Sequence, residues 1–250
     1  MNPYGGLMKR YLAVLVLGVA LACVQTASPT SAATYAFHDE FSGTSLNTAV
    51  WTAETRSLGG VCSSASNVRV SGGYLRMTAR QGSTAACPWV GSRLVTANKR
   101  YLGYGLVQAR VKWNAAPGFW GGFVMFGKAS GGSRLADGEI DTEIRDGMIH
   151  YRLWSVDSAD RRCGIAIDKP NNSLDQWHTF GVNRQPSYTQ FFLDGVKQAT
   201  ITKSQLLAKG CTWPFERRFS LVLSARAGGW GGTPDPAKFP VTALVDWVRQ

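Results

Sequence analysis

The stretch Asp137-Gly138-Glu139-Ile140-Asp141-Thr142-Glu143-Ile144 places three carboxylates at strict two-residue spacing. Side chains of a β-strand alternate between its two faces, so Glu139, Asp141 and Glu143 share one face and the residues between them the other. The apolar face suits a sheet that covers a hydrophobic core. Like charges on one face repel each other and lower stability, which indicates that these carboxylates carry out chemistry.

Two carboxylates on either side of a glycosidic bond are the usual machinery of glycoside hydrolysis. In an extended strand the Cα atoms of Glu139 and Glu143 lie roughly 13 Å apart. The carboxyl groups of a retaining glycosidase lie about 5–5.5 Å apart, so the two side chains must lean together on a curved strand. The spacing is therefore compatible with retention on a concave sheet. The alternative is an acidic strand face that is only solvated.

The N-terminus has the layout of a secretory signal. Lys9 and Arg10 precede a short apolar run, and small residues follow up to Ala33. The run is too short to span a membrane. We therefore expect a signal peptide over residues 1–33, a single catalytic domain over residues 34–250, and a secreted protein without stable membrane insertion.

The cysteines agree with export. An even number of cysteines after the signal indicates two disulfides, for which four cysteines allow three connectivities. Proximity in sequence favours Cys62–Cys87 and Cys163–Cys211, although the sequence alone does not choose. A fifth cysteine, Cys23, lies in the signal and offers the alternative of a lipid-anchored N-terminus.

The rest of the chain favours an all-β fold. Short runs rich in Val, Leu, Tyr, Phe and Trp are separated by Gly, Asn, Asp and Pro, which predicts a sandwich or jelly roll of two antiparallel sheets. One helical turn is expected at Ser204–Lys209. The predicted strands are Val68–Val70, Tyr74–Thr78, Gly105–Trp113, Gly121–Gly127, Glu139–Ile144, Met148–Trp154, His178–Asn183, Tyr188–Leu193, Phe219–Ala225 and Val241–Val248.

The net charge is +11, and +9 without Lys9 and Arg10. The basic residues are scattered and form no basic helix or arginine-rich arm, which argues against nucleic acid as a partner. Such a charge keeps an exported protein soluble or attracts acidic polysaccharides. Sugar rings stack on aromatic side chains, and the tryptophans considered for this, each with a core position as the alternative, are Trp113, Trp120, Trp154, Trp213 and Trp230.

Taken with its flanks, the carboxylate strand resembles glycoside hydrolase family 16. The family signature is E-[IL]-D-x-E or a bulged form with one extra residue, and Glu139–Glu143 matches the regular form. Further segments resemble the family in the same order along the chain: Phe37–Trp51, Ser92-Arg93, Tyr104–Lys112, Pro117–Gly127, Trp177–Phe180, Phe192–Gly195, Gly228-Gly229 and Val245–Arg249.

The resemblance implies a concanavalin A-like β-jelly roll with a substrate cleft across its concave sheet. It implies that Glu139 is the nucleophile, that Glu143 is the general acid/base and that Asp141 orients Glu139. Asp246 matches a position that binds a structural calcium in many members, while the chemistry itself needs no cofactor. His150 is either a cleft residue or a hydrogen-bonded histidine of the sandwich. The residues expected to contact substrate are Trp120, Trp230, His150, Arg93 and Trp113.

The sequence also departs from the family. Arg184 stands at a family Trp and Ser224 at a family Asn, which puts the usual neutral glucans in doubt. Arg145, Arg152 and Arg184 would suit a sulfated or uronic-acid glycan if they face the cleft, or would only add charge to the convex face.

The sequence thus predicts a monomeric, secreted, retaining endo-glycosidase that hydrolyses internal β-linkages of a polysaccharide. The first choice of substrate is a β-1,3- or β-1,3-1,4-glucan. The alternatives are a transglycosylase on the same fold, a hydrolase of an acidic or sulfated β-glycan, and a lectin-like domain without catalysis.

Overall fold

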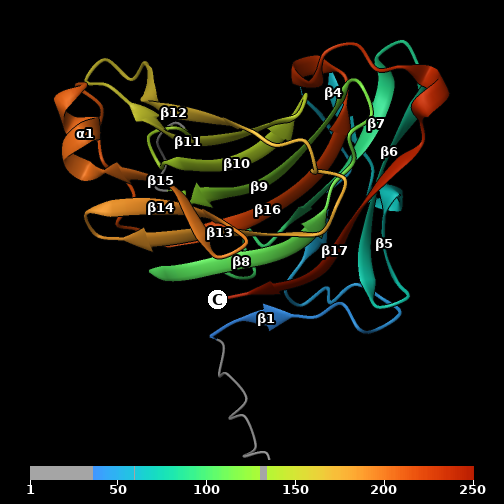
Figure 1. The fold of residues 1–250 in the computed structure, drawn as a ribbon, viewed down its shortest axis with the longest axis horizontal. Coiled ribbons are helices and arrows are strands. Elements are labelled where there is room, and N and C mark those ends of the chain that lie inside the picture. Colours follow the sequence, from blue (N-terminus) through green and yellow to red (C-terminus); the bar gives the residue numbers. More distant parts are fainter. Residues whose placement is uncertain (1–35, 59, 130–133) are drawn as a thin grey trace, which may run out of the picture. The chain divides into compact units, whose positions relative to one another are not determined.

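The carboxylate strand, β10 (Glu139–Arg145), lies inside a curved antiparallel sheet that we call the inner sheet (Figure 1). This computed structural model describes residues 36–58, 60–129 and 134–250, so the predicted signal peptide lies outside the described residues. The strand order of the inner sheet is β2 (Thr52–Ala53), β7 (Cys87–Val95), β16 (Phe219–Ala227), β9 (Phe119–Gly127), β10, β11 (Met148–Val156) and β12 (Arg162–Pro170).

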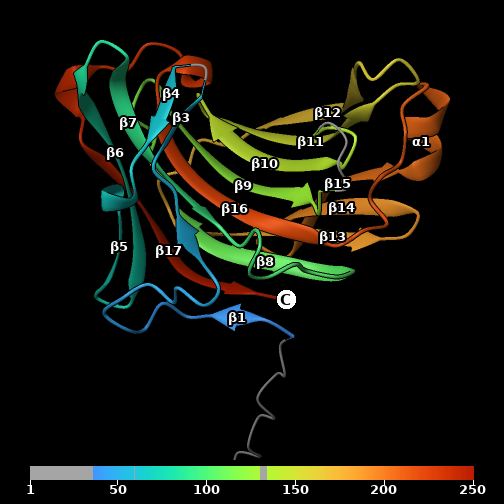
Figure 2. The ribbon, with the colours of Figure 1, turned by 180° about the vertical axis from the view of Figure 1, so that it is seen from behind.

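A second antiparallel sheet, the outer sheet, packs against the convex side of the inner one (Figure 2). Its strand order is β5 (Val68–Ser71), β6 (Tyr74–Thr84), β17 (Val241–Arg249), β8 (Gly105–Lys112), β13 (His178–Gln185), β14 (Tyr188–Leu193) and β15 (Val196–Thr202), with β1 (His38–Asp39) also paired to β17. This is the predicted sandwich of two antiparallel sheets.

The long hairpin of β6 and β7 connects the two sheets at one end of the sandwich (Figure 1). A short pair, β3 (Arg56–Leu58) and β4 (Val61–Ser63), lies beside it, and β4 runs parallel to β7. The single described α-helix, α1 (Lys203–Ala208), lies at the other end, one residue before the predicted turn. Thr202 and Gln205 cap its N-terminus reciprocally. The described 3₁₀ turns are η1 (Ala65–Asn67), η2 (Gly229–Gly231) and η3 (Pro236–Lys238).

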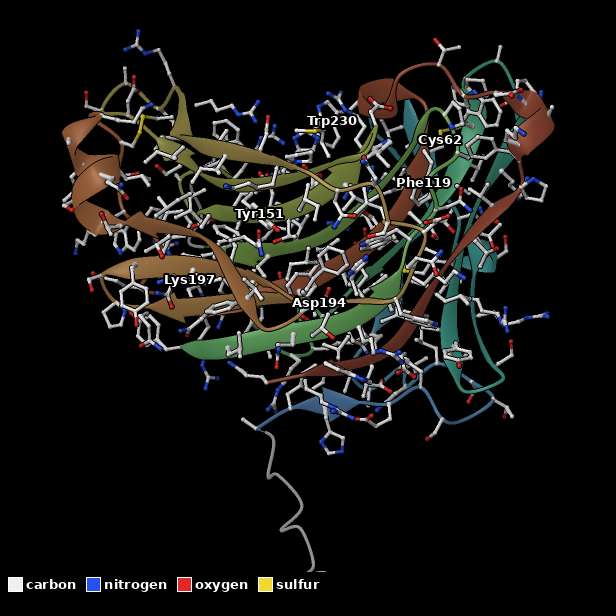
Figure 3. The ribbon with its side chains drawn as sticks, in the orientation of Figure 1. Cys62, Phe119, Tyr151, Asp194, Lys197 and Trp230 are labelled. Atoms are coloured by element: carbon white, nitrogen blue, oxygen red, sulfur yellow. A yellow bond between two sulfur atoms is a disulfide. The ribbon has the colours of Figure 1, made fainter. Side chains whose placement is uncertain are left out.

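The hydrophobic core fills the space between the two sheets. On β10, Ile140 and Ile144 are 0% and 1% exposed, which confirms that the apolar face of this strand covers the core. From β11, Tyr151 lies between the layers (Figure 3), with its ring centroid 5.2 Å from that of Phe191 on β14. Burying such side chains stabilises the fold by about 1.5–3 kcal/mol each and holds β10 with its carboxylates on the opposite side.

Trp113 belongs to this core, so its assignment as a substrate contact is wrong. Its side chain is 1% exposed and packs edge-on against Phe180 at 6.1 Å. A Cβ atom on Gly121 would lie 2.6 Å from the Trp113 ring, so glycine is needed to admit the indole beneath β9. The alternation of β8 gives the reason, because Trp113 continues the buried phase of Val107, Ala109 and Val111.

Two disulfides confirm the connectivity favoured by sequence proximity. Cys62–Cys87 joins β4 to the start of β7, with Cα atoms 5.7 Å apart. Cys163–Cys211 joins the edge strand β12 to the segment after α1, with Cα atoms 5.4 Å apart. The second bridge fixes an edge strand of the inner sheet, where fewer backbone hydrogen bonds hold the chain.

Trp113→Ala should lower the free energy of unfolding by about 3–5 kcal/mol, because it leaves a cavity between the sheets. Val196→Ala, at a side chain that is 62% exposed, is the control and should change stability by less than about 0.5 kcal/mol. Urea denaturation measures both. A Trp113→Ala protein as stable as wild type would contradict the core assignment.

Candidate active site

A two-residue turn fixes the hairpin of β10 and β11. Asp146 and Gly147 both have positive φ, 49° and 71°, as a type I′ turn requires, and Arg145 pairs with Met148 across the turn. The register then continues without a shift, so each carboxylate has a defined neighbour on β11. The cross-strand pairs are Glu143 with His150, Asp141 with Arg152 and Glu139 with Trp154.

The register is equally continuous against β9, so the carboxylate strand has the regular, unbulged form. Gly122 lies opposite Glu143. A Cβ atom on Gly122 would lie 3.1 Å from Ser224 Oγ and 3.6 Å from Glu143 Cγ. Because residue 122 is glycine, no side chain fills the space beside Glu143 on β9.

A cleft crosses the concave face of the inner sheet, and Glu139 and Glu143 line it on both sides of β10. The β16 half, over β7, β9 and β16, is further lined by Arg56, Val61, Arg93, Trp120, Val124, Phe126, Arg134, Val222, Ser224 and Arg226. The β12 half, over β11 and β12, is further lined by Trp120, Asp141, Arg152, Trp154, Arg162, Ala166 and Trp230.

Asp141 and Glu139 form a hydrogen-bonded pair. Burial raises the pKa of Asp141 well above its usual range, and the charges of Glu139 and Glu143 raise it further. Burial also raises the pKa of Glu139, but the charge of Arg134 and the hydrogen bond from Asp141 oppose this rise. Arg134 Nη2 donates to Glu139 Oε2 at 2.9 Å. The arrangement keeps a proton on Asp141 and favours the ionised form of Glu139.

Glu143 has the opposite environment, since it has no hydrogen-bond or ion-pair partner among the described residues. Burial and then the negative charge of Glu139 raise its pKa from 4.5 to about 7. The cleft thus holds one glutamate whose charged form has two stabilising partners and one that keeps its proton to near neutral pH. Such a divergence of two carboxyl pKa values is typical of an acid/base assignment.

Two of the predicted substrate contacts form the wall between the halves. Trp120, on β9, lines both halves and donates from Nε1 to the Gly228 carbonyl at 2.9 Å. Trp230, on η2, lines the β12 half (Figure 3), and its ring lies edge-on to Trp120 at 5.6 Å. Arg145 lies over the Trp230 ring at 4.4 Å. Both tryptophans therefore lie in the cleft, with their rings held by neighbours.

Trp154, another of the tryptophans considered, lines the β12 half opposite Glu139. A Cβ atom on Gly164 would lie 2.4 Å from its ring, so the indole lies across that glycine of β12. The guanidinium of Arg162 lies 3.8 Å from the ring centroid.

His150 and Arg93 support the cleft walls more than they face the cleft. His150 is 4% exposed, its Nδ1 lies 2.8 Å from Asp168 Oδ1, and its ring contacts Trp230 at 4.9 Å. Burial lowers the pKa of His150 and favours its neutral form. Arg93 lines the β16 half, is 9% exposed and forms an ion pair with Glu54.

The three arginines singled out in the sequence have different positions. Arg152 faces the β12 half and forms an ion pair with Asp168 at 3.2 Å. Arg145 lies against Trp230. Arg184 is neither a cleft residue nor a surface charge. It is 0% exposed and donates to the carbonyls of Leu102, Gly103, Phe215 and Arg217, so it ties two loops together.

Asp246, the predicted calcium ligand, accepts a hydrogen bond from Arg110 at 2.6 Å. The described residues contain no group of three or more His, Cys, Asp and Glu side chains that could hold a metal ion. Calcium also takes backbone carbonyl oxygens as ligands, so a structural calcium at Asp246 stays a prediction.

Sequence reasoning missed Arg134 and Arg226, which line the cleft. No short sequence motif around Arg134 would have identified it as a cleft residue. Arg226 lies two residues after Ser224 on β16 and so shares its face, which strand alternation predicts. The Asp146-Gly147 turn is also a strong hairpin signal, and its register alone would have placed Arg152 and Trp154 beside the carboxylates.

The family model of glycosyl hydrolases family 16 matches residues 59–249. The chain belongs to this family. It is a glycoside hydrolase, and the resemblance seen in the sequence is confirmed. Within the described residues, no helix combines the length and hydropathy needed to cross a bilayer.

Among relatives of this family member, a beta-glucanase of Rhodothermus marinus is 28% identical over 73% of this chain and 69% of its own. A glucan endo-1,3-beta-glucosidase A1 of Niallia circulans is 26% identical over 85% of this chain, which spans only 37% of that relative's length. The solved endo-beta-1,3-glucanase of Pyrococcus furiosus matches with a TM-score of 0.75 and 27% identity over 86% of this chain and 92% of its own.

The raised pKa of Glu143 predicts how stability depends on pH. Between about pH 4.5 and pH 7 the folded protein keeps a proton that the unfolded chain has released, so the free energy of unfolding falls as pH rises through this window. Glu143→Gln removes the ionisation. At pH 8 it should raise the free energy of unfolding by about 1–3 kcal/mol over wild type, with little difference at pH 4.5.

Urea denaturation at the two pH values measures this difference. Glu216→Gln is the control, because Glu216 is exposed and forms only a surface ion pair with Lys203. It should have only a small effect on the free energy of unfolding at either pH. A Glu143→Gln protein that is not stabilised at pH 8 would show that Glu143 is not held protonated.

Proposed function

We propose that this family 16 enzyme is an endo-acting retaining glycosidase that hydrolyses internal β-linkages of a polysaccharide. The observation that carries the proposal is the placement of Glu139 and Glu143 on one cleft with opposite environments. Glu139 has a cation, Arg134, and a hydrogen bond from Asp141, whereas Glu143 has neither. The pair thus supplies a nucleophile and a general acid, as retention requires.

In the first step the Glu139 carboxylate attacks the anomeric carbon and forms a glycosyl ester as the glycosidic C–O bond breaks. Glu143 gives its proton to the departing oxygen. Formation of the ester removes the negative charge of Glu139, which is the second cause of the raised pKa of Glu143. The pKa of Glu143 therefore falls at the point where it must act as a base.

In the second step Glu143 takes a proton from water, and the resulting hydroxide attacks the anomeric carbon from the opposite side. The ester bond breaks, Glu139 returns to its carboxylate, and the sugar is released with its original configuration. Asp141 contributes by keeping the hydrogen bond to Glu139, which holds that carboxylate in place and stabilises it as the leaving group.

The first substrates to test are β-1,3- and β-1,3-1,4-glucans. The names of the relatives from Rhodothermus marinus, Niallia circulans and Pyrococcus furiosus support this choice. Action outside the cell is part of the proposal, and two disulfides and the signal-like layout of residues 1–33 support it.

Glu139→Gln should lower kcat/KM on laminarin and mixed-linkage β-glucan by at least about a thousandfold, because the amide cannot attack the anomeric carbon. Glu143→Ala should lose about 10²–10⁴-fold on these polymers, for want of a general acid. On an aryl β-glycoside with a good leaving group, azide should restore turnover of Glu143→Ala and yield a β-glycosyl azide.

The measurements are released reducing ends and mass spectrometry of the azide product. Glu216→Gln, outside the cleft, should retain wild-type rates. Full activity of Glu143→Ala on unactivated polysaccharide would refute the assignment of the general acid. Absence of reducing ends from any polysaccharide with the wild type would favour a carbohydrate-binding domain without catalysis.

A further inference from the structure

The β16 half of the cleft holds more positive charge than its own carboxylates balance. Arg56 and Arg93 share a single partner, Glu54, whose Oε2 lies 3.6 Å from Arg56 Nη1 and closer to Arg93. Arg134 pairs with Glu139, and Arg226 adds a fourth guanidinium to the lining. It forms no hydrogen bond or ion pair with any described residue, and its Nε is buried without a partner.

The side chain of Arg226 is packed between neighbouring residues of the cleft. A Cβ atom on Gly91 of β7 would lie 2.9 Å from Arg226 Cα and 3.2 Å from its Cγ, so glycine makes room for the stem. The guanidinium lies 5.0 Å from the ring centroid of Trp120. Two residues earlier on the same face of β16, Ser224 lies opposite Gly122, the neighbour of Glu143. Arg226 is therefore a cleft residue one row from the general acid.

An unpaired cation in this position is unfavourable in the free protein. Burial, and then the charges of Arg93 and Arg56, lower the pKa of Arg226 to about 10. A buried charge without a partner costs stability, and an anionic ligand would remove that cost by accepting the hydrogen bonds that no protein group accepts. Guanidinium groups are well suited to this, because their donors match carboxylate and sulfate oxygens.

We infer that the β16 half of the cleft binds an acidic sugar unit, whose carboxylate or sulfate ester accepts hydrogen bonds from Arg226 with Arg56 at its rim. The inference rests on the proposed function and names its substrate class, a β-glycan that carries carboxylate or sulfate groups. Arg226 is not one of the three arginines singled out in the sequence.

Three polymers with the same β-1,3-glucan backbone separate charge from linkage: laminarin, carboxymethyl-curdlan and curdlan sulfate. The rates of reducing-end release are compared for wild type, Arg226→Met and Arg226→Lys. Arg69→Met is the matched control, because it removes the same charge from an exposed position on β5, outside the cleft. Affinity electrophoresis of Glu139→Gln, with and without Arg226→Met, measures binding separately from hydrolysis.

Wild type should prefer at least one charged polymer over laminarin, and added salt should weaken the preference. Arg226→Met should lower kcat/KM on that polymer about 10- to 100-fold more than on laminarin. Arg226→Lys should retain part of the preference, and Arg69→Met all of it. A preference for carboxymethyl-curdlan would identify the ligand group as a carboxylate, and a preference for curdlan sulfate would identify it as a sulfate ester.

The melting temperature distinguishes a ligand site from a structural role. Because the unpaired cation destabilises the free protein, Arg226→Met should have a Tm equal to or above that of wild type. A lower Tm with an equal loss on all three polymers would assign Arg226 a structural role and overturn the inference. Equal wild-type rates and affinities for charged and neutral polymers would also overturn it.

Failure of the proposed function gives a different result. If wild type releases no reducing ends but binds a charged polymer in a manner that requires Arg226, the glycosidase assignment fails and the acidic-sugar site stands. If laminarin is hydrolysed and Arg226→Met changes neither the rates nor the affinities on charged polymers, the glycosidase assignment stands and the site does not.

Discussion

The negative charge of Glu139 beside a buried Glu143 is the interaction on which the chemistry depends. In water the two carboxyl groups would ionise at similar pH, and neither would hold a proton at neutral pH. Here burial disfavours both charges, and the partners of Glu139 decide which group ionises first. The cost of this arrangement is offset on the other side of β10, where Ile140 and Ile144 pack into the core and prevent the strand from turning over.

The two halves of the cleft differ in chemistry because different strands build them. In the β12 half, Trp154 and Trp230 line the cleft, and the arginines there pair with Asp168 or lie over the indole rings. In the β16 half, arginines outnumber their carboxylate partners. A polysaccharide that crosses β10 therefore meets tryptophans with paired arginines on one side and an excess of positive charge on the other.

Strand alternation predicted much of this site because its period of two is strict wherever one face is buried. It placed the carboxylates of β10 together and, extended through β8, would have put Trp113 in the core. Strand alternation gave no correct prediction where a charged residue occupies a core-facing position. Arg184 occupies a buried phase of β13, and only the carbonyls of loops distant in sequence make that position tolerable. The edge strand β12 escaped detection because all its residues are half-buried or exposed, so neither face shows a buried apolar pattern.

Titration of the glutamate side-chain carboxyl carbons by ¹³C NMR reports directly on the proton that Glu143 holds. One glutamate signal should titrate near pH 7. It should disappear in Glu143→Gln and move to lower pH in Glu139→Gln, because the neighbouring negative charge is gone. A spectrum in which every glutamate titrates below about pH 5 would contradict this assignment, since the two carboxyl groups would then have no division of roles.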